Sequence, residues 1–232
     1  MEDNPVAMEG ERKPLRADAE RNRRRLIDAA TAIFCERGLE VGVGEISDKA
    51  GVGRGTLFRN FPSKEHLIAA IVVERIQQMV DRGRAQLDAE DAGEALFGLL
   101  DESVGLQQTD RALFAALDDN WLTNDEIHAA HVEMMGVLDA LVARAQAAGA
   151  VREDVGAVDV MMMVKGVCEA TRSFQHVDPA IGARQLDLVR AALSPSPGCR
   201  PLRGQPPALE DLDPAAIPAT TAEPQLAERA TG

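Results

Sequence analysis

The sequence predicts an all-α fold, and its composition, apolar spacing and turn signals all support that class. Of the 232 residues 45% are hydrophobic, yet only 3% are aromatic and tyrosine is absent. Such a composition favours helices and lacks the aromatic and β-branched runs typical of sheets. Apolar residues recur at intervals of three and four through most of the chain. A chain of this size can bury a core and suits one large or two small domains.

The pattern divides the chain into four parts. Residues 1–18 are polar and unpatterned and are expected to form a flexible arm. Residues 19–66 carry short helices, and residues 67–194 form a larger helical domain. Residues 195–232 are expected to be a disordered tail, because eight of the twelve prolines lie there among few large apolar groups.

Helix boundaries follow from glycine, proline and serine positions. Gly38 and Gly51 are expected to end helices, Pro62 to stop one, and Ser63 to be the N-cap of the next. Two short helices joined by a tight glycine turn make a helix-turn-helix, here at about residues 44–61. The expected helices are residues 20–37, 44–50, 54–60, 63–86, 93–108, 111–118, 124–148, 156–174 and 179–193.

Charge is distributed unevenly along a chain whose formal net charge is -13. Residues 12–64 hold twelve Lys and Arg against seven Asp and Glu, a net charge of +5. Residues 65–232 hold thirteen against 27, a net charge of -14, and residues 1–11 hold four acids and no base. Charges interact with DNA phosphates over a short range only, so the negative net charge of the whole chain does not exclude binding of nucleic acid by the basic segment. It predicts salt-sensitive binding by the basic segment alone.

Several classes of protein are disfavoured. No apolar run approaches the ~20 residues of a membrane span, and the N-terminus has no secretory signal. Cys35, Cys168 and Cys199 are widely separated, which is typical of reduced thiols in a cytoplasm. His128 and His131 lack the further Cys or carboxylate ligands that a metal site needs. We therefore expect a cytoplasmic protein with no membrane contact, no metal, no cofactor and no catalytic residues.

The second short helix has an apolar side and a polar side. Leu57 and Phe61, four residues apart, are expected to pack into a small core. Polar residues then remain on the solvent side: Arg54, Thr56, Arg59 and Asn60. A helix with this surface suits a DNA major groove, where Arg pairs with guanine and Asn with adenine.

Residues 21–67, RNRRRLIDAATAIFCERGLEVGVGEISDKAGVGRGTLFRNFPSKEHL, resemble the DNA-binding domain of the TetR (tetracycline-repressor) family. The shared motifs, in order, are AA-x-x-x-F, ERG, E-I-x-x-x-AGV, G-T-L-aromatic-x-x-F and P-S-K-E-x-L. The resemblance implies a homodimer that binds double-stranded operator DNA at two half-sites. It also implies that a small-molecule effector, unknown here, enters the helical domain and releases the DNA.

The resemblance further implies a set of DNA-contacting residues: Arg54, Gly55, Thr56, Phe58, Arg59, Asn60 and Lys64, with Lys49 and Arg21 beside them. Two positions depart from the family pattern. Phe58 stands where Tyr is common, and Gly42 stands where Ser or Thr usually caps the helix and touches phosphate. Fewer phosphate contacts are therefore expected. The arginines at 16, 21, 23, 24 and 25 either compensate for this loss or form a solvated helix start.

The larger domain contains soft, bulky side chains that suit either a ligand pocket or an ordinary core: Phe97, Phe114, Trp121, His131, Met134, Met135, Met161, Met162 and Phe174. The excess of acids favours a neutral or cationic guest. The segment VMMMVKGVC is apolar nearly all round, so it must be covered on both sides. Because family members pair their last two helices, the candidate dimer residues are Val160, Met163, Val164, Val167, Leu186, Val189 and Leu193.

These features predict a sequence-specific DNA-binding transcriptional regulator, and a ligand-released repressor is the favoured form. One alternative is a regulator without a ligand pocket, either constitutive or controlled by a protein partner. Another is a ligand carrier or enzyme with an incidental helix-turn-helix. The last would require a clustered set of nucleophile, base or metal ligands, which the sequence does not contain.

Overall fold

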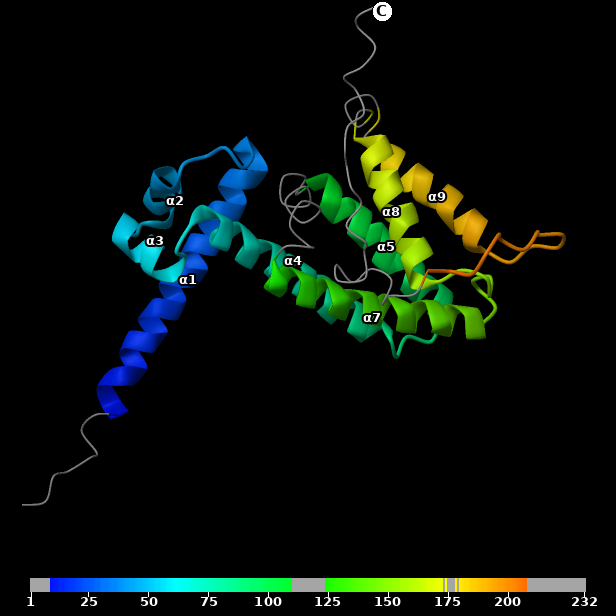
Figure 1. Cartoon of the computed structure of the whole chain (residues 1–232), viewed down its shortest axis with the longest axis horizontal. Coiled ribbons are helices and arrows are strands. Elements are labelled where there is room, and N and C mark those ends of the chain that lie inside the picture. The colour runs from blue at the N-terminus through cyan, green and yellow to red at the C-terminus, as the bar shows by residue number, and fades with distance from the viewer. Residues whose placement is uncertain (1–8, 110–123, 173, 175–177, 179, 208–232) are drawn as a thin grey trace, which may run out of the picture.

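The computed structural model describes residues 9–109, 124–172, 174, 178 and 180–207. This part of the chain contains eight helices and no strands, which confirms the all-α prediction (Figure 1). The expected helix at 111–118 lies outside the described residues. The helices are α1 (Glu9–Arg37), α2 (Val43–Ala50), α3 (Arg54–Asn60), α4 (Lys64–Gln86), α5 (Ala92–Thr109), α7 (Asp125–Ala147), α8 (Ala157–Thr171) and α9 (Ile181–Leu193).

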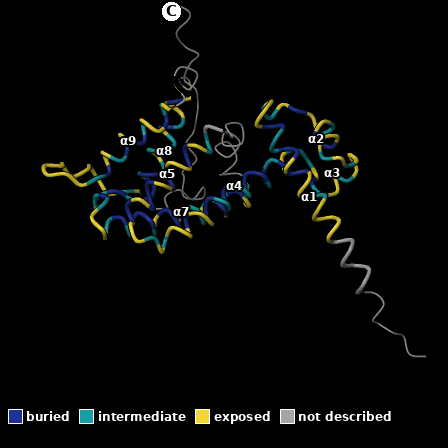
Figure 2. Tube along the Cα trace, turned by 180° about the vertical axis from the view of Figure 1, so that it is seen from behind, coloured by how far each residue is buried: buried dark blue, intermediate teal, exposed yellow. Residues whose placement is uncertain are grey.

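Helices α1–α3 and the start of α4 surround a small core of their own. Its fully buried side chains include Phe34, Ile46, Leu57 and Phe61, as the spacing predicted. We call this part the module (residues 19–66) and the rest, α4–α9, the body. Burial follows this division, with buried positions on the inner sides of the helices in both parts (Figure 2).

Helix α4 joins the two parts because it contributes side chains to both cores. Its first turns place Leu67 and Ile71 in the core of the module. Further along, Val72, Ile76 and Val80 lie in the core of the body. In Figure 1, α4 runs from beneath the module into the body, where it lies along α7. Helix α4 is therefore packed in both parts of the molecule.

The body is built on a close contact of α4 with α5 and α7. Gly83 on α4 is buried, and a Cβ atom at this position would lie 2.6 Å from Val137 Cγ1 and 3.3 Å from Leu99 Cδ2. Arg144 closes the C-terminal end of α4 by donating hydrogen bonds to the carbonyl oxygens of Gln86 and Ala89, at 3.1 and 2.7 Å. Helices α8 and α9 pack side by side across α5.

Helix α1 begins at Glu9, earlier than the expected start at residue 20. The prediction of a flexible arm is therefore wrong for residues 9–18. Polarity alone suggested an arm, but Leu, Arg, Ala and Glu are good helix formers even without an apolar face. Asp18 and Arg21, three residues apart, form an ion pair on the exposed side of this helix.

The beginning of the predicted disordered tail is also ordered. Residues 195–207, which we call the C-terminal strap, lie against the connection between α7 and α8. Leu202 donates its backbone N–H to Asp154 Oδ2 at 2.7 Å, and Arg152 Nη2 donates to the Arg200 carbonyl at 2.8 Å. Pro206 packs against Gly156, where a Cβ atom would lie 2.9 Å from the proline Cβ. Two hydrogen bonds, from Arg152 and from Leu202, lower the pKa of Asp154 to about 2.

Candidate DNA-binding surface and cavity

The turn between α2 and α3 depends on glycine. Gly51 ends α2 with a φ of 66°, in the left-handed region that residues with a Cβ rarely adopt. The Gly51 and Val52 amides bond to the carbonyls of Asp48 and Ser47 at 3.2 and 3.1 Å. Helix α3 then starts after Gly53, so the glycine turn fixes the direction in which α3 leaves α2.

Helix α3 presents the polar surface that the sequence predicted. Arg54, Gly55, Phe58 and Arg59 are exposed, and Phe58 keeps 47% of its accessible surface. Arg59 folds back along its own helix, because its Nε and Nη2 donate to the Gly55 carbonyl and Thr56 Oγ1, both at 3.2 Å. Asn60 Nδ2 donates to the Thr56 carbonyl at 2.8 Å. Hydrogen bonds within α3 therefore hold the side chains of Arg59 and Asn60.

The flanking residues lie around α3. Lys64 is the first residue of α4 and is half-buried. Ser63 precedes it as expected, but its hydroxyl lies 3.0 Å from His66 Nδ1 and makes no capping bond to the backbone. A hydrogen bond from that hydroxyl lowers the pKa of Glu65. Lys49 lies 3.7 Å from Glu36, so this lysine and Arg21 both have acidic partners in the DNA-free protein.

Two arginines of the α1 cluster have roles in packing. The Arg23 guanidinium lies 4.6 Å from the centre of the Phe61 ring, above the core of the module. Arg24 Nη1 lies 2.7 Å from Glu74 Oε1 on α4 and so links the first and fourth helices. These packing roles were not among the alternatives considered for the cluster, which stay open for the arginines as DNA contacts. Arg25 on α1 is exposed.

The body contains a cavity of about 100 Å³ between α4, α5, α7 and α8. Apolar side chains form most of its wall: Ile76, Met79, Leu99, Leu100, Met134, Met135, Leu138, Met161 and Val164. Four polar residues complete it: Ser103, Gln107, His131 and Lys165. Gln107 Nε2 donates to Ser103 Oγ at 3.4 Å, one helical turn away on α5.

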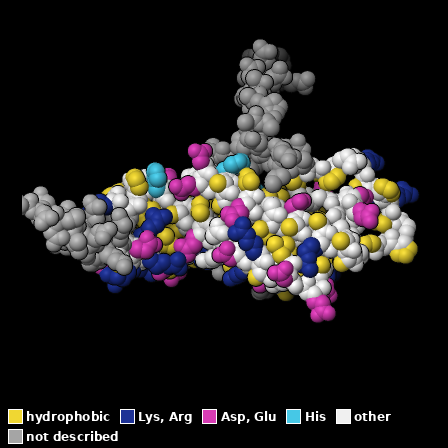
Figure 3. All heavy atoms as spheres, turned by 90° about the horizontal axis from the view of Figure 1, so that it is seen from below, with side chains coloured by type: hydrophobic (Ala, Val, Ile, Leu, Met, Phe, Trp, Pro, Cys, Tyr) yellow, Lys and Arg dark blue, Asp and Glu magenta, His cyan; other side chains and the backbone are white. Residues whose placement is uncertain are grey.

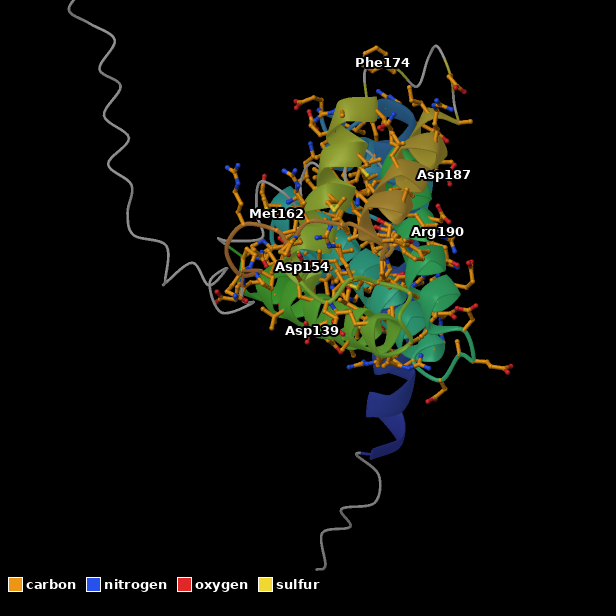
Figure 4. The ribbon with its side chains drawn as sticks, turned by 90° about the vertical axis from the view of Figure 1, so that its right-hand side faces the viewer. Asp139, Asp154, Met162, Phe174, Asp187 and Arg190 are labelled. Atoms are coloured by element: carbon orange, nitrogen blue, oxygen red, sulfur yellow. The ribbon has the colours of Figure 1, made fainter. Side chains whose placement is uncertain are left out.

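Four of the nine residues expected to form a pocket lie on this cavity: His131, Met134, Met135 and Met161. Phe97 is buried elsewhere, under the Arg190 guanidinium, which lies 4.5 Å from the ring centre. Met162 and Phe174 are exposed, at 60% and 54%, and point outwards from α8 and the segment after it (Figure 4). Phe114 and Trp121 lie outside the described residues. Phe97, Met162 and Phe174 therefore do not line this cavity, and whether they contact a ligand stays a prediction.

The charge on the cavity wall differs from the charge of the body as a whole. Among its described residues there is a lysine but no Asp or Glu. The acids of the body lie on its outer surface, where charged and hydrophobic side chains are interspersed (Figure 3). The sequence predicted a neutral or cationic guest from the excess of acids; the described wall suits the neutral guest but holds no acidic side chain for a cation. Lys165 and Gln107 were missed because a single polar residue in an apolar helix carries no periodic signal.

The expected dimer residues occupy a different place from the one predicted. Val160, Val164, Val167, Leu186, Val189 and Leu193 are all buried within the protomer. Met163 is half-buried against the same core. The six buried side chains therefore face the core of their own domain. A helix that is apolar all round does not reveal which side its own domain covers, and here the domain covers the valine side.

The described part of the chain has no group of three or more His, Cys, Asp or Glu residues arranged to hold a metal ion. Likewise, none of the helices that the structure describes is long and apolar enough to cross a membrane.

In this protein a short basic module carries two helices joined by a glycine turn, and one long helix connects the module to an acidic helical body. This arrangement defines a helix-turn-helix DNA-binding regulator. Residues 26–71 match the family described as bacterial regulatory proteins, tetR family. Residues 91–195 match the SbtR-like C-terminal domain of transcriptional regulators. The chain belongs to the TetR family, whose members are transcriptional regulators and not enzymes.

Individual relatives agree with this assignment. The repressor KstR of Mycolicibacterium smegmatis is 33% identical over 150 residues, 60% of this chain and 71% of the relative. KstR of Rhodococcus jostii is 31% identical, and the chain spans 63% of its length, less than two thirds. A TetR regulator from Mycobacterium vanbaalenii is 34% identical, covers 78% of this chain and all of its own, and superposes with a TM-score of 0.59. One from Streptomyces coelicolor is 28% identical, with a TM-score of 0.60 over 75% of this chain and 99% of its own.

Proposed function

We propose that this protein is a homodimeric repressor that binds operator DNA through α3 and releases it when a ligand occupies the cavity of the body. The observation that carries this proposal is the double role of α4. Ile76 and Met79 of α4 form part of the cavity wall, and Leu67 and Ile71 of the same helix lie in the core of the module. A guest that moves α4 therefore changes where α3 lies.

The side chains of α3 suggest a division of roles on DNA. Arg54 is exposed at the N-terminal end of the helix, the end that contacts base edges in helix-turn-helix proteins. We assign it a base contact, together with Asn60. Lys64 lies at the start of α4, where its charge and the free N-terminal amides suit a phosphate. Arg59, held by Thr56, is assigned to the backbone beside it.

The dimer surface is assigned to the exposed sides of α8 and α9. Met162 and Leu188 keep 60% and 59% of their surface, which is high for large apolar residues. Gly166, Ala170 and Ala191 are also exposed on these two helices and allow close helix contact. This surface replaces the buried residues that the sequence suggested. Two half-sites of a near-palindrome then match two modules.

The size of the cavity limits the ligand mechanism. A volume of about 100 Å³ is below the roughly 300–1,000 Å³ of ordinary ligand sites. A guest of ordinary size must therefore widen the cavity. Methionines permit such widening, because their unbranched side chains adopt several shapes. With Lys165, Gln107 and Ser103 on the wall, the favoured guest is apolar with an anionic or hydrogen-bond-accepting end.

Repression is favoured over activation because the relatives that match 56–60% of this chain carry the name repressor. A shorter match, 33% identical over 34% of this chain, is to a protein named activator FasR, so activation is the second candidate. Either activity would be exerted in the cytoplasm, where bacterial DNA lies.

The test begins with selection of bound duplexes from a random DNA library by the full-length protein. We expect the selection to enrich one near-palindromic site. In a strain that lacks the gene for this protein, we expect increased transcription of a reporter gene placed downstream of that site. Recovery of no common site would contradict sequence-specific binding. Reduced transcription in the deletion strain would favour an activator.

A further inference from the structure

Gly44 is a helical glycine whose backbone conformation does not require glycine. It is the second residue of α2, and its φ is not positive. Alanine is more favourable than glycine at such a helical position. A glycine that is not needed for conformation is explained by what occupies the space of its missing side chain.

That space is filled by Arg54 from the start of α3. A Cβ atom on Gly44 would lie 3.0 Å from Arg54 Cζ, 3.2 Å from Nε and nearer still to Nη2. No other atom is as close to that position. The guanidinium therefore lies across the first turn of α2, in the angle between the two helices.

No acidic side chain in the described structure determines this placement. Arg54 has no ion pair or side-chain hydrogen bond with the described residues, and the neighbouring Glu45 pairs with Arg37. Arg59 on the same helix is different, because Gly55 and Thr56 hold it by hydrogen bonds. The position of Arg54 is thus set by shape, and its donors remain available for DNA.

We infer that Gly44 is a specificity-determining residue: its missing side chain lets the Arg54 guanidinium lie across α2 and so decides which base pair Arg54 reads. The inference rests on the proposed base contact of Arg54. A side chain held in one direction before binding loses less freedom on binding, which sharpens discrimination between base pairs. A methyl group at position 44 would push the guanidinium out of this angle.

The test uses full-length wild type, Gly44→Ala, Arg54→Ala and the double variant, each selected against a random duplex library and then measured on the enriched site. We expect Gly44→Ala to lose preference at the same base pair as Arg54→Ala and to bind the enriched site about 5- to 100-fold more weakly. In the Arg54→Ala background, Gly44→Ala should have no further effect. The melting temperature of the Gly44→Ala single variant should be no lower than that of the wild type.

Gly98→Ala is the matched control, because Gly98 is an exposed helical glycine on α5 with no atom within 4 Å of a Cβ. Its DNA preference should equal that of the wild type. If Gly44→Ala weakens binding equally with and without Arg54, the methyl group acts directly on DNA and the inference is overturned. An unchanged preference in Gly44→Ala also overturns it. An unchanged preference in Arg54→Ala would remove the base contact assigned to Arg54 and with it this inference, whereas enrichment of a common site by the wild type would leave the proposed function standing.

Discussion

The module and the body each contain a buried apolar core, yet they differ in how much of their chemistry can be inferred from sequence. In the module, Leu57 and Phe61 are fully buried, and the opposite side of α3 carries the polar residues that the spacing predicted. In the body, the family resemblance suggested Val160 and Leu186 as dimer residues, and both are buried within the protomer.

The difference arises from the number of surfaces that each helix must satisfy. Helix α3 has one core and one solvent side, so a single apolar stripe defines both. Helix α8 has a core, a cavity wall and an exposed side, occupied in turn by Val160, Met161 and Met162. Because all three are apolar, hydrophobic periodicity does not distinguish them. Polar residues identify a binding surface when the partner is itself polar, as DNA is.

The largest expected effect tests the outer side of the body. Leu188→Asp should raise the dimer dissociation constant at least 100-fold, because burying an unpaired carboxylate in an interface costs about 3 kcal/mol or more. Sedimentation velocity at micromolar concentration measures it. Leu202→Asp is the control, since Leu202 is similarly exposed at 48% but lies on the strap. A Leu188→Asp protein that remains as dimeric as wild type would place the interface elsewhere.

The next test concerns the contact that fixes α4 in the body. Gly83→Ala should lower the free energy of unfolding by about 1–3 kcal/mol, because the added methyl would meet Val137, whose branched side chain has little freedom to move. Gly98→Ala, with open space around it, should instead gain up to ~1 kcal/mol. Urea unfolding compares the two variants. Equal stabilities would mean that α4 and α7 separate easily.

Within the module, phosphate and base contacts can be separated. Lys64→Ala should weaken cognate and scrambled duplexes by the same factor and lower the salt slope by about one phosphate contact. Fluorescence anisotropy at several salt concentrations measures both quantities. A loss confined to the cognate duplex would make Lys64 a reader of sequence.

A smaller gain is expected from Phe58→Tyr. Phe58 is 47% exposed on α3, and a hydroxyl there can donate to a phosphate oxygen. We expect tighter binding by about 1 kcal/mol, roughly fivefold, since one hydrogen bond is added. Anisotropy titration of the selected duplex is the measurement. Unchanged or weaker binding would mean that the ring faces no phosphate.

The smallest effect concerns the strap. The pKa of Asp154 is lowered to about 2, so the stabilisation it gives is fully present above its ordinary value of 3.8 and is lost as the pH falls through about 2. At neutral pH, Asp154→Asn should therefore loosen the strap and speed trypsin cleavage after Arg203, the arginine of the strap that is not followed by proline. Glu153→Gln, on the adjacent exposed residue, is the control. Equal cleavage rates in all three proteins would contradict an anchoring role.

Sequence reasoning reached the fold class, the family and the bounds of α3 and α4, because each depends on local signals such as Gly51, Pro62 and Ser63. It missed what depends on distant contacts. Asp154 and Leu202 are 48 residues apart, and nothing in the local pattern of either predicts their hydrogen bond. Two further features likewise arise only when the helices pack: Arg54 lies over Gly44, and Lys165 lies on the cavity wall.

The central claim is that filling the cavity weakens DNA binding through α4. It can be tested without knowing the effector by replacing Met134, on the cavity wall, with Cys in a chain whose three cysteines have been removed. Attachment of a benzyl group through a methanethiosulfonate reagent then fills the cavity. The matched control carries the same group at Asp139→Cys, on the exposed side of α7 (Figure 4).

The measurement is the dissociation constant of the selected duplex before and after labelling, with circular dichroism to confirm that the protein stays folded. We predict at least a fivefold weaker complex for the protein labelled at 134 and no change for the protein labelled at 139, in line with typical coupling energies of about 1–3 kcal/mol. A folded protein, labelled at 134, that binds the duplex as tightly as before would contradict the account.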